Sequence, residues 1–276
     1  MSKLIPTQAI HRKFDLTSDA PSPESKANTA RWFAEMIIKD FLSDKFPTGD
    51  NFQNSSIGEL ILKLKGKIHP TVIDALNQIK KIGDQASHYN SNQKILDIDA
   101  KKSIDTAFSL FPLLIIDHLK KNPLSEHPDR ALLLSTTLPS IRLQILDEIM
   151  EFDSDKVTQY QLEILHKWCL ACAKSGKRDK ARRKLKDLLK RNKISIETHS
   201  FEENSINEIT RRMANNELPI AKTHADFVRN FGNVMNRLSQ HSKEENAELI
   251  KLLNGMVEGI EPSEMGHLKG MQIFPV

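Results

Sequence analysis

Hydrophobic residues in the first half of the chain recur every three or four positions, the spacing that places them on one face of an α-helix. This pattern predicts four helices, over residues 26–42, 57–64, 70–83 and 98–119. Ser25 stands directly before the first of them as the expected N-cap. The fourth is apolar on most sides and contains Pro112, so we expect a buried helix that bends at this proline.

The second half of the chain continues the same pattern after one interruption. Residues 122–129 hold two prolines and no hydrophobic period, which is typical of a domain boundary. Helical segments are expected beyond it, near residues 130–137, 139–152, 155–175, 178–192, 204–216, 223–240 and 243–257. We therefore expect an N-terminal arm over residues 1–24, a helical domain over 25–122 and a second helical domain over 123–276.

Composition agrees with an all-α fold. The chain of 276 residues has only 10 Gly, 12 Pro and 6% aromatic residues, whereas β-sandwiches and barrels need many tight turns and β-branched or aromatic strands. Residues 168–190 form two helical patterns around Gly176, and this segment resembles one tetratricopeptide-type (TPR-like) hairpin. A plain antiparallel helical hairpin explains the same residues equally well.

Several kinds of site are disfavoured by the motifs present. The sequence contains no glycine-rich phosphate-binding motif and no G-x-S-x-G nucleophile motif, so we expect no cofactor. His166, Cys169 and Cys172 follow at three-residue steps, which drift around a helix and do not converge on a tetrahedral metal ion. We expect no metal, and two packing cysteines in a reducing compartment. The longest apolar run is about half a membrane span, which favours a cytoplasmic protein without membrane contact.

The segment KKIGDQASHYN, residues 80–90, carries the most informative group of polar side chains. Lys81, Asp84 and His88 are spaced three and four apart, so a helix would present all three on one face. Histidine acts as a general acid or base near neutral pH, and a cation beside it stabilises a phosphate. Together with the upstream ARWFAEMIIKDFL and an apolar closing helix, this segment makes residues 25–122 resemble the HEPN superfamily.

The branch that the chain resembles carries an arginine, a Gly-Asn pair and a terminal histidine, and is often encoded near restriction and anti-phage systems. Gly83 and Asp84 occupy the pair here, and His88 occupies the histidine position. The basic position falls on Lys80 or Lys81. Active superfamily members are metal-independent RNases whose site is usually duplicated across a dimer, so the resemblance implies a homodimer. It also implies one possible catalytic set, with His88 as acid or base, Asp84 orienting it and a lysine facing the phosphate.

A second interpretation of the same segment is structural. Lysine does not offer the planar bidentate contact that arginine makes to a phosphate, so the substitution is not conservative. Gly83 would then end or kink the helix, and Asp84 and His88 would be structural hydrogen-bonding residues near its end. We favour this interpretation, in which the HEPN-like domain dimerises and binds without catalysis.

Positive charge is concentrated in one part of the chain. Residues 167–193 hold twelve Lys or Arg and two Asp, a net +10, although the whole chain carries only +4. Ala181, Leu185 and Leu188 share one helix face and leave the cations on the others, an arrangement suited to a phosphate backbone. The candidate RNA or DNA contacts are Lys177, Arg178, Lys180, Arg182, Arg183, Lys184, Lys186, Lys190 and Arg191.

These features favour a nucleic-acid-associated accessory or effector protein, and the resemblance adds a role in bacterial anti-phage defence. Two alternatives remain open. The first is a metal-independent RNase that uses His88. The second is a helical interaction scaffold in which the basic run docks an acidic protein partner, or pairs with the acidic residues of 147–155 within this chain.

Overall fold

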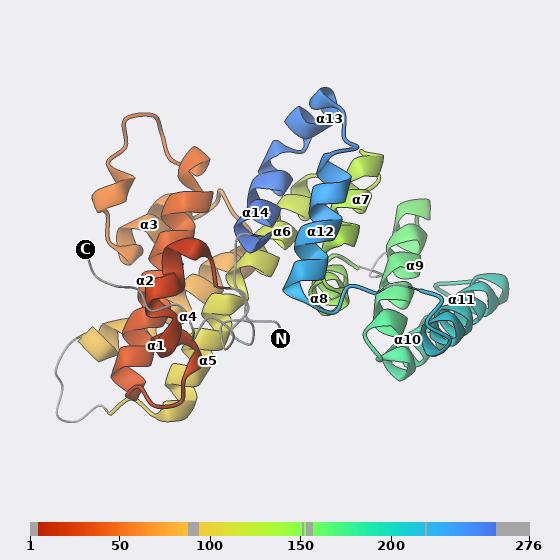
Figure 1. Ribbon diagram of the computed structural model, residues 1–276, viewed down its shortest axis with the longest axis horizontal. Helices are drawn as coiled ribbons and strands as arrows, with labels where there is room; N and C mark the ends of the chain where they lie inside the picture. Colours follow the sequence, from red (N-terminus) through yellow and green to blue (C-terminus); the bar gives the residue numbers. More distant parts are fainter. Residues whose placement is uncertain (1–4, 88–93, 151, 153–156, 219, 258–276) are drawn as a thin grey trace. The chain divides into compact units, whose positions relative to one another are not determined.

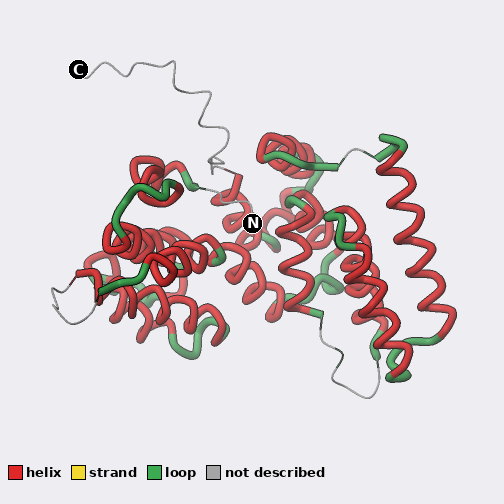
Figure 2. The backbone as a smooth tube through the Cα atoms, turned by 90° about the horizontal axis from the view of Figure 1, so that it is seen from below, coloured by secondary structure: helices red, strands yellow, loops and turns green. Residues whose placement is uncertain are grey.

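The chain forms helices joined by loops (Figures 1 and 2). This computed structural model describes residues 5–87, 94–150, 152, 157–218 and 220–257, and no strand occurs among them. The predicted all-α class is confirmed. None of the helices in these ranges combines the length and the apolar character that crossing a membrane requires. The sequence also predicts that the apolar C-terminal segment GHLKGMQIFPV docks on the body or on a neighbouring molecule, and this segment lies outside the described residues.

The helices assemble into two compact units. The N-terminal unit contains the described residues of 3–117 and of 248–276, and the C-terminal unit contains those of 118–247. The predicted boundary at residues 122–129 lies close to the observed one, which falls within a helix rather than in the proline-containing segment. The last helix differs from the prediction, because it belongs to the N-terminal unit.

The N-terminal unit is built around one long buried helix. Its elements are η1 (Thr7–Arg12), α1 (Lys13–Thr17), α2 (Pro23–Phe41), η2 (Ser43–Lys45), η3 (Phe52–Asn54), α3 (Ile57–Leu64), α4 (Pro70–Ser87), α5 (Asp97–Phe108), α6 (Leu110–Lys121, as far as residue 117) and α14 (Ala247–Val257, from residue 248). Helix α2 packs against both α4 and α5 and buries Phe33, Ile37 and Ile38. It therefore provides the core of this unit.

The start of α2 and the segment before it differ from the prediction. Helix α2 begins at Pro23, and Ser22 caps it by accepting a hydrogen bond from the backbone N–H of Ser25 at 3.2 Å. Proline suits the first helical position because it has no N–H to leave unsatisfied, so the N-cap lies before Pro23 rather than at Ser25. Residues 7–17 are helical rather than a loose arm, and α1 packs against α2.

The apolar segment over residues 98–119 forms two helices, α5 and α6, with a break at Ser109. Pro112 lies in the first turn of α6 and has no N–H to donate to the carbonyl of Phe108, where α5 ends. The prediction of one helix that bends at Pro112 is therefore wrong, since the segment forms two helices. Helix α6 is largely buried, as the pattern indicated, whereas α5 buries one face and exposes residues such as Ile98.

The C-terminal unit contains α7 (Pro128–Thr136), α8 (Pro139–Ile149), α9 (Gln159–Lys174), α10 (Arg178–Lys190), α11 (Ile196–Ala214), α12 (His224–Met235) and α13 (Gln240–Glu245). Helix α9 packs against α8, α10 and α11. The α9–α10 hairpin turns at Gly176, whose φ of 71° lies in the left-handed region that glycine adopts without strain. Helix α11 begins at Ile196, eight residues before the predicted start, and Ser195 caps it. The hydrophobic pattern missed its first two turns because they are mostly polar.

Helix α14 joins the N-terminal unit through close packing at a glycine. A Cβ atom at Gly255 would lie 2.3 Å from Cε1 of Phe41 and 2.8 Å from Cε1 of Phe111. Lys251 donates a hydrogen bond to the carbonyl of Phe41 at 3.2 Å, and Lys45 forms an ion pair of 2.7 Å with Glu248. Only a residue without a side chain fits between α14 and these two aromatic rings.

We expect Gly255→Ala to lower the free energy of unfolding by about 1–3 kcal/mol, because the added methyl overpacks the buried contact with Phe41 and Phe111. Gly232→Ala is the matched control, since nothing lies within 4 Å of its Cβ position in α12. That change should stabilise the protein by roughly 0.5–1 kcal/mol through helix propensity. Thermal unfolding of the two variants checks the prediction, and equal effects would contradict it.

Candidate functional site

Helix α4 continues through Gly83 to Ser87, so the prediction that this glycine ends the helix is wrong. Gly83 is buried where α2 passes close to α4. A Cβ atom there would lie 2.8 Å from Cβ of Arg31 and 2.9 Å from its Cδ. The glycine therefore allows the stem of Arg31 to lie against the backbone of α4.

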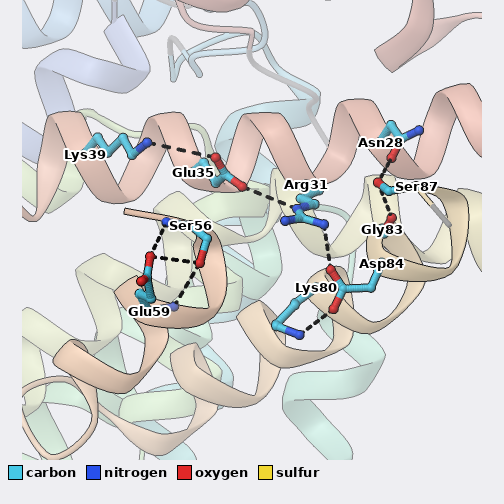
Figure 3. Close-up of polar contacts among 10 residues, drawn as sticks. All are labelled: Asn28, Arg31, Glu35, Lys39, Ser56, Glu59, Lys80, Gly83, Asp84 and Ser87. Carbon is cyan, nitrogen blue, oxygen red and sulfur yellow. Dashed lines mark hydrogen bonds and ion pairs between the residues drawn. The ribbon is translucent and has the colours of Figure 1, made fainter. Parts of the chain in front are cut away.

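This close approach brings Arg31 onto Asp84 (Figure 3). The Nη1 atom of Arg31 donates to Oδ1 of Asp84 at 2.6 Å, and the Nζ atom of Lys80 donates to Oδ2. The side chains of Arg31 and Asp84 are 23% and 32% exposed. A half-buried carboxylate is thus held between two cations, with each of its oxygens engaged.

The Asp84 cluster belongs to a longer polar seam along α2 and α4 (Figure 3). Beyond Arg31, Glu35 accepts from Nε of Arg31 at 3.3 Å and pairs with Lys39 at 4.0 Å. In the other direction, the hydroxyl of Ser87 bonds Asn28 Oδ1 at 2.8 Å. These side chains occupy facing stripes of two helices, and opposite charges alternate along them.

The structure brings together part of the predicted catalytic set. Lys80 and Asp84 form an ion pair. Lys81 is exposed, and among the described residues only Arg31 and Lys80 form ion pairs with Asp84. His88 lies outside the described residues. The geometry of the described part therefore makes Asp84 an anchor for two cations.

Arg31 is the residue that the sequence analysis missed. It comes from α2, 53 positions before Asp84, so no local motif contains both. The polar positions Asn28, Arg31 and Glu35 recur at steps of three and four along α2, on the side that faces Asp84 and Ser87. This polar stripe could have predicted the contact, because polar side chains on an otherwise buried helix need hydrogen-bond or ion-pair partners.

Helix α10 is amphipathic as predicted, with Ala181, Leu185 and Leu188 buried. Three of the candidate contact residues, Lys180, Arg182 and Arg191, have ion-pair partners within the C-terminal unit. Lys180 forms an ion pair of 2.5 Å with Asp147, which also accepts from the indole N–H of Trp168 at 2.5 Å.

Arg182 has several partners from α10 and α11. It donates to Oδ1 of Asn207 at 2.6 Å and lies 3.6 Å from Glu203. At the end of α10, Arg191 pairs with Asp187 at 3.5 Å. Together with Lys180, these pairs show that part of the basic run is compensated internally, and Asp147 comes from the acidic stretch considered above.

Six of the nine candidate contacts have no ion-pair partner among the described residues. They are Lys177, Arg178, Arg183, Lys184, Lys186 and Lys190. Arg183, Lys186 and Lys190 follow at steps of three and four and are all exposed, on the side of α10 away from its buried face. We name these three residues the basic ridge. It offers three adjacent charges that the fold does not use.

A second group of cations lies at the end of α9. Burial lowers the pKa of the Lys174 ammonium, and the charges of Arg142 and Arg212 lower it further. Arg142 comes from α8 and donates to the carbonyl of Thr137 at 2.7 Å. Positive potential therefore extends beyond α10 within the same unit.

The cysteines are packing residues. Cys169 and Cys172 are fully buried, and burial, with the Asp147 charge as a smaller cause, raises the pKa of the Cys172 thiol to about 12. His166 bonds Glu202 rather than either thiol. No group of three potential metal-binding side chains occurs in the part of the chain that the structure describes.

Comparison with known proteins finds no matching family model, no matching curated protein and no matching solved structure. The HEPN-like resemblance of residues 25–122 and the TPR-like resemblance of the hairpin therefore remain predictions.

We expect Asp84→Asn to lower the free energy of unfolding by about 1–2 kcal/mol, because it removes the carboxylate that Arg31 and Lys80 share and leaves Glu35 as the remaining ion-pair partner of Arg31 in a half-buried seam. Lys81→Gln is the neighbouring control and should change stability by less than about 0.5 kcal/mol. Urea unfolding measures both. If the two variants unfold at the same urea concentration, Asp84 does not anchor the seam.

Proposed function

We propose that this protein binds RNA or DNA through the phosphate backbone, with the basic ridge of α10 as the contact surface. The observation that carries the proposal is the exposure of Arg183, Lys186 and Lys190 on one side of a helix whose opposite side is buried. None of the three has an ion-pair partner among the described residues. Without a negatively charged ligand, these three neighbouring positive charges repel one another and destabilise the helix.

The expected binding is electrostatic and independent of sequence. Cations that neutralise phosphates release condensed counterions, which is the main source of affinity in such contacts. Helix α10 contains no aromatic residue, so base stacking contributes nothing from this helix. Phosphate contacts position a nucleic acid without reading its bases.

For the N-terminal unit we propose a dimerising module without catalysis, in an accessory or effector protein of bacterial anti-phage defence. The defence role and the dimer rest on the HEPN-like resemblance. The absence of catalysis is supported by Asp84, whose two carboxylate oxygens are engaged by Arg31 and Lys80. Arg31 is therefore engaged in a contact between α2 and α4, and Lys80 is engaged in a pair within α4.

The triple variant Arg183→Gln, Lys186→Gln, Lys190→Gln should lose affinity for duplex DNA and flatten the dependence of binding on salt. Each lost phosphate contact lowers the slope of log K against log salt by about 0.9, so the slope should fall by about 2 to 3. Fluorescence anisotropy with a labelled duplex, repeated over a range of salt concentrations, measures both quantities.

A charge-matched control for that experiment is Lys65→Gln, Lys102→Gln, Arg237→Gln, which removes three exposed cations outside α10. The control should keep the slope of the unchanged protein. A ridge variant that binds as tightly as the control would overturn the proposal. If neither the unchanged protein nor the control binds RNA or DNA, the scaffold with an acidic protein partner becomes the better account.

A separate test addresses the RNase alternative. The unchanged protein and His88→Ala are incubated with total RNA in excess EDTA, and the RNA ends are sequenced. We expect no ends that depend on His88, because Asp84, the residue proposed to orient His88, is already engaged by Arg31 and Lys80. Cleavage that survives EDTA and disappears in His88→Ala would establish the RNase instead.

A further inference from the structure

A cleft of about 480 Å³ lies between α9 and α11 in the C-terminal unit. Its lining includes Leu162, Glu163 and His166 from α9, and Glu197, Phe201 and Glu202 from α11. The volume falls within the range that small-molecule sites occupy. None of these residues belongs to the basic ridge, so the cleft is a second feature that the proposed function does not explain.

The polar lining of the cleft includes a buried carboxylate that contacts a partly exposed imidazole. Glu202 is only 3% exposed, and its Oε2 and Oε1 lie 3.0 and 3.2 Å from Nδ1 of His166. The buried carboxylate accepts hydrogen bonds and therefore favours a ligand that brings hydrogen-bond donors.

An apolar surface lies beside these acceptors. Phe201 is 59% exposed although it is a large aromatic residue, and its ring centroid lies 5.5 Å from that of His166. Leu162 is half-buried and lines the same cleft. An exposed phenylalanine next to a leucine favours a ligand with an aliphatic portion that covers them, and the face of the ring also attracts a cation.

The charge of the cleft selects the ligand further. Exposed carboxylates come from both of its helices, Glu163 from α9 and Glu197 from α11. Together with Glu202 they give the lining three glutamates. The same lining contains one lysine, Lys167, and no arginine. Phosphates are therefore disfavoured here, and a ligand with more than one positive charge is favoured.

We propose that this cleft binds an aliphatic diamine or polyamine. The alkyl chain lies over Phe201 and Leu162. Its ammonium groups donate to the carboxylates of the cleft, Glu202 in the interior and Glu163 or Glu197 at the opening. The proposal does not depend on nucleic-acid binding, since the basic ridge and the cleft share no residue.

Isothermal titration calorimetry of the nucleic-acid-free full chain tests this directly. The ligands are 1,5-diaminopentane and spermidine, with 1,5-pentanediol as the uncharged counterpart of the diamine. We expect saturable binding of both amines at a single site and no binding of the diol. Absence of saturable binding by either amine would overturn the proposal.

Matched variants then locate the site. Phe201→Ala should weaken amine binding about tenfold through loss of the apolar and cation–π contact. Ile196→Ala should leave it unchanged, because Ile196 is a similarly exposed apolar residue of α11 that does not line the cleft. Both residues are exposed, so far-ultraviolet circular dichroism should show an unchanged helical fold.

The pair Glu163→Gln, Glu197→Gln should weaken binding by at least about tenfold, whereas the control pair Glu24→Gln, Glu244→Gln should not weaken it. If the control pair weakens binding as much, or if Phe201→Ala has no effect, the amines are attracted by diffuse negative charge and the proposal is wrong.

Discussion

The carboxylate of Asp84 lies between the guanidinium of Arg31 and the ammonium of Lys80, and this contact joins the two helices that form the centre of the N-terminal unit. It depends on Gly83, because any side chain there would collide with the stem of Arg31. Removing one member of a half-buried ion cluster leaves the others uncompensated. The residues that resemble a catalytic motif therefore have a structural role in this unit.

In the C-terminal unit, some cations of α10 are paired within the fold and others are not. Lys180 and Arg182 are held by Asp147, Glu203 and Asn207, so they fasten α10 to its neighbours. The basic ridge has no such partner among the described residues, which is why we propose it as the contact surface for a polyanion. On α9 and α11 the balance is reversed, since carboxylates outnumber cations around the cleft. One unit thus offers opposite charge to two different kinds of ligand.

The sequence patterns predicted those features of the fold that depend on residues close together in the chain. The amphipathic face of α10 and the turn at Gly176 are both local consequences of residue type. The role of Gly83 was misread because its requirement comes from Arg31 on another helix. A lone glycine near a helix end more often marks the end itself. The place of α14 was missed for the same reason, since its partners Phe41 and Phe111 lie far away in the sequence.

Binding at the basic ridge, with the Asp84 seam left as structural support, is the central claim. Amide NMR of isotope-labelled protein titrated with a short generic RNA or DNA duplex tests it most directly. The account predicts shifts that concentrate on residues 177–191 and leave residues 80–87 unchanged. Shifts at residues 80–87 with none along α10 would contradict it, and would return the binding surface to the HEPN-like segment.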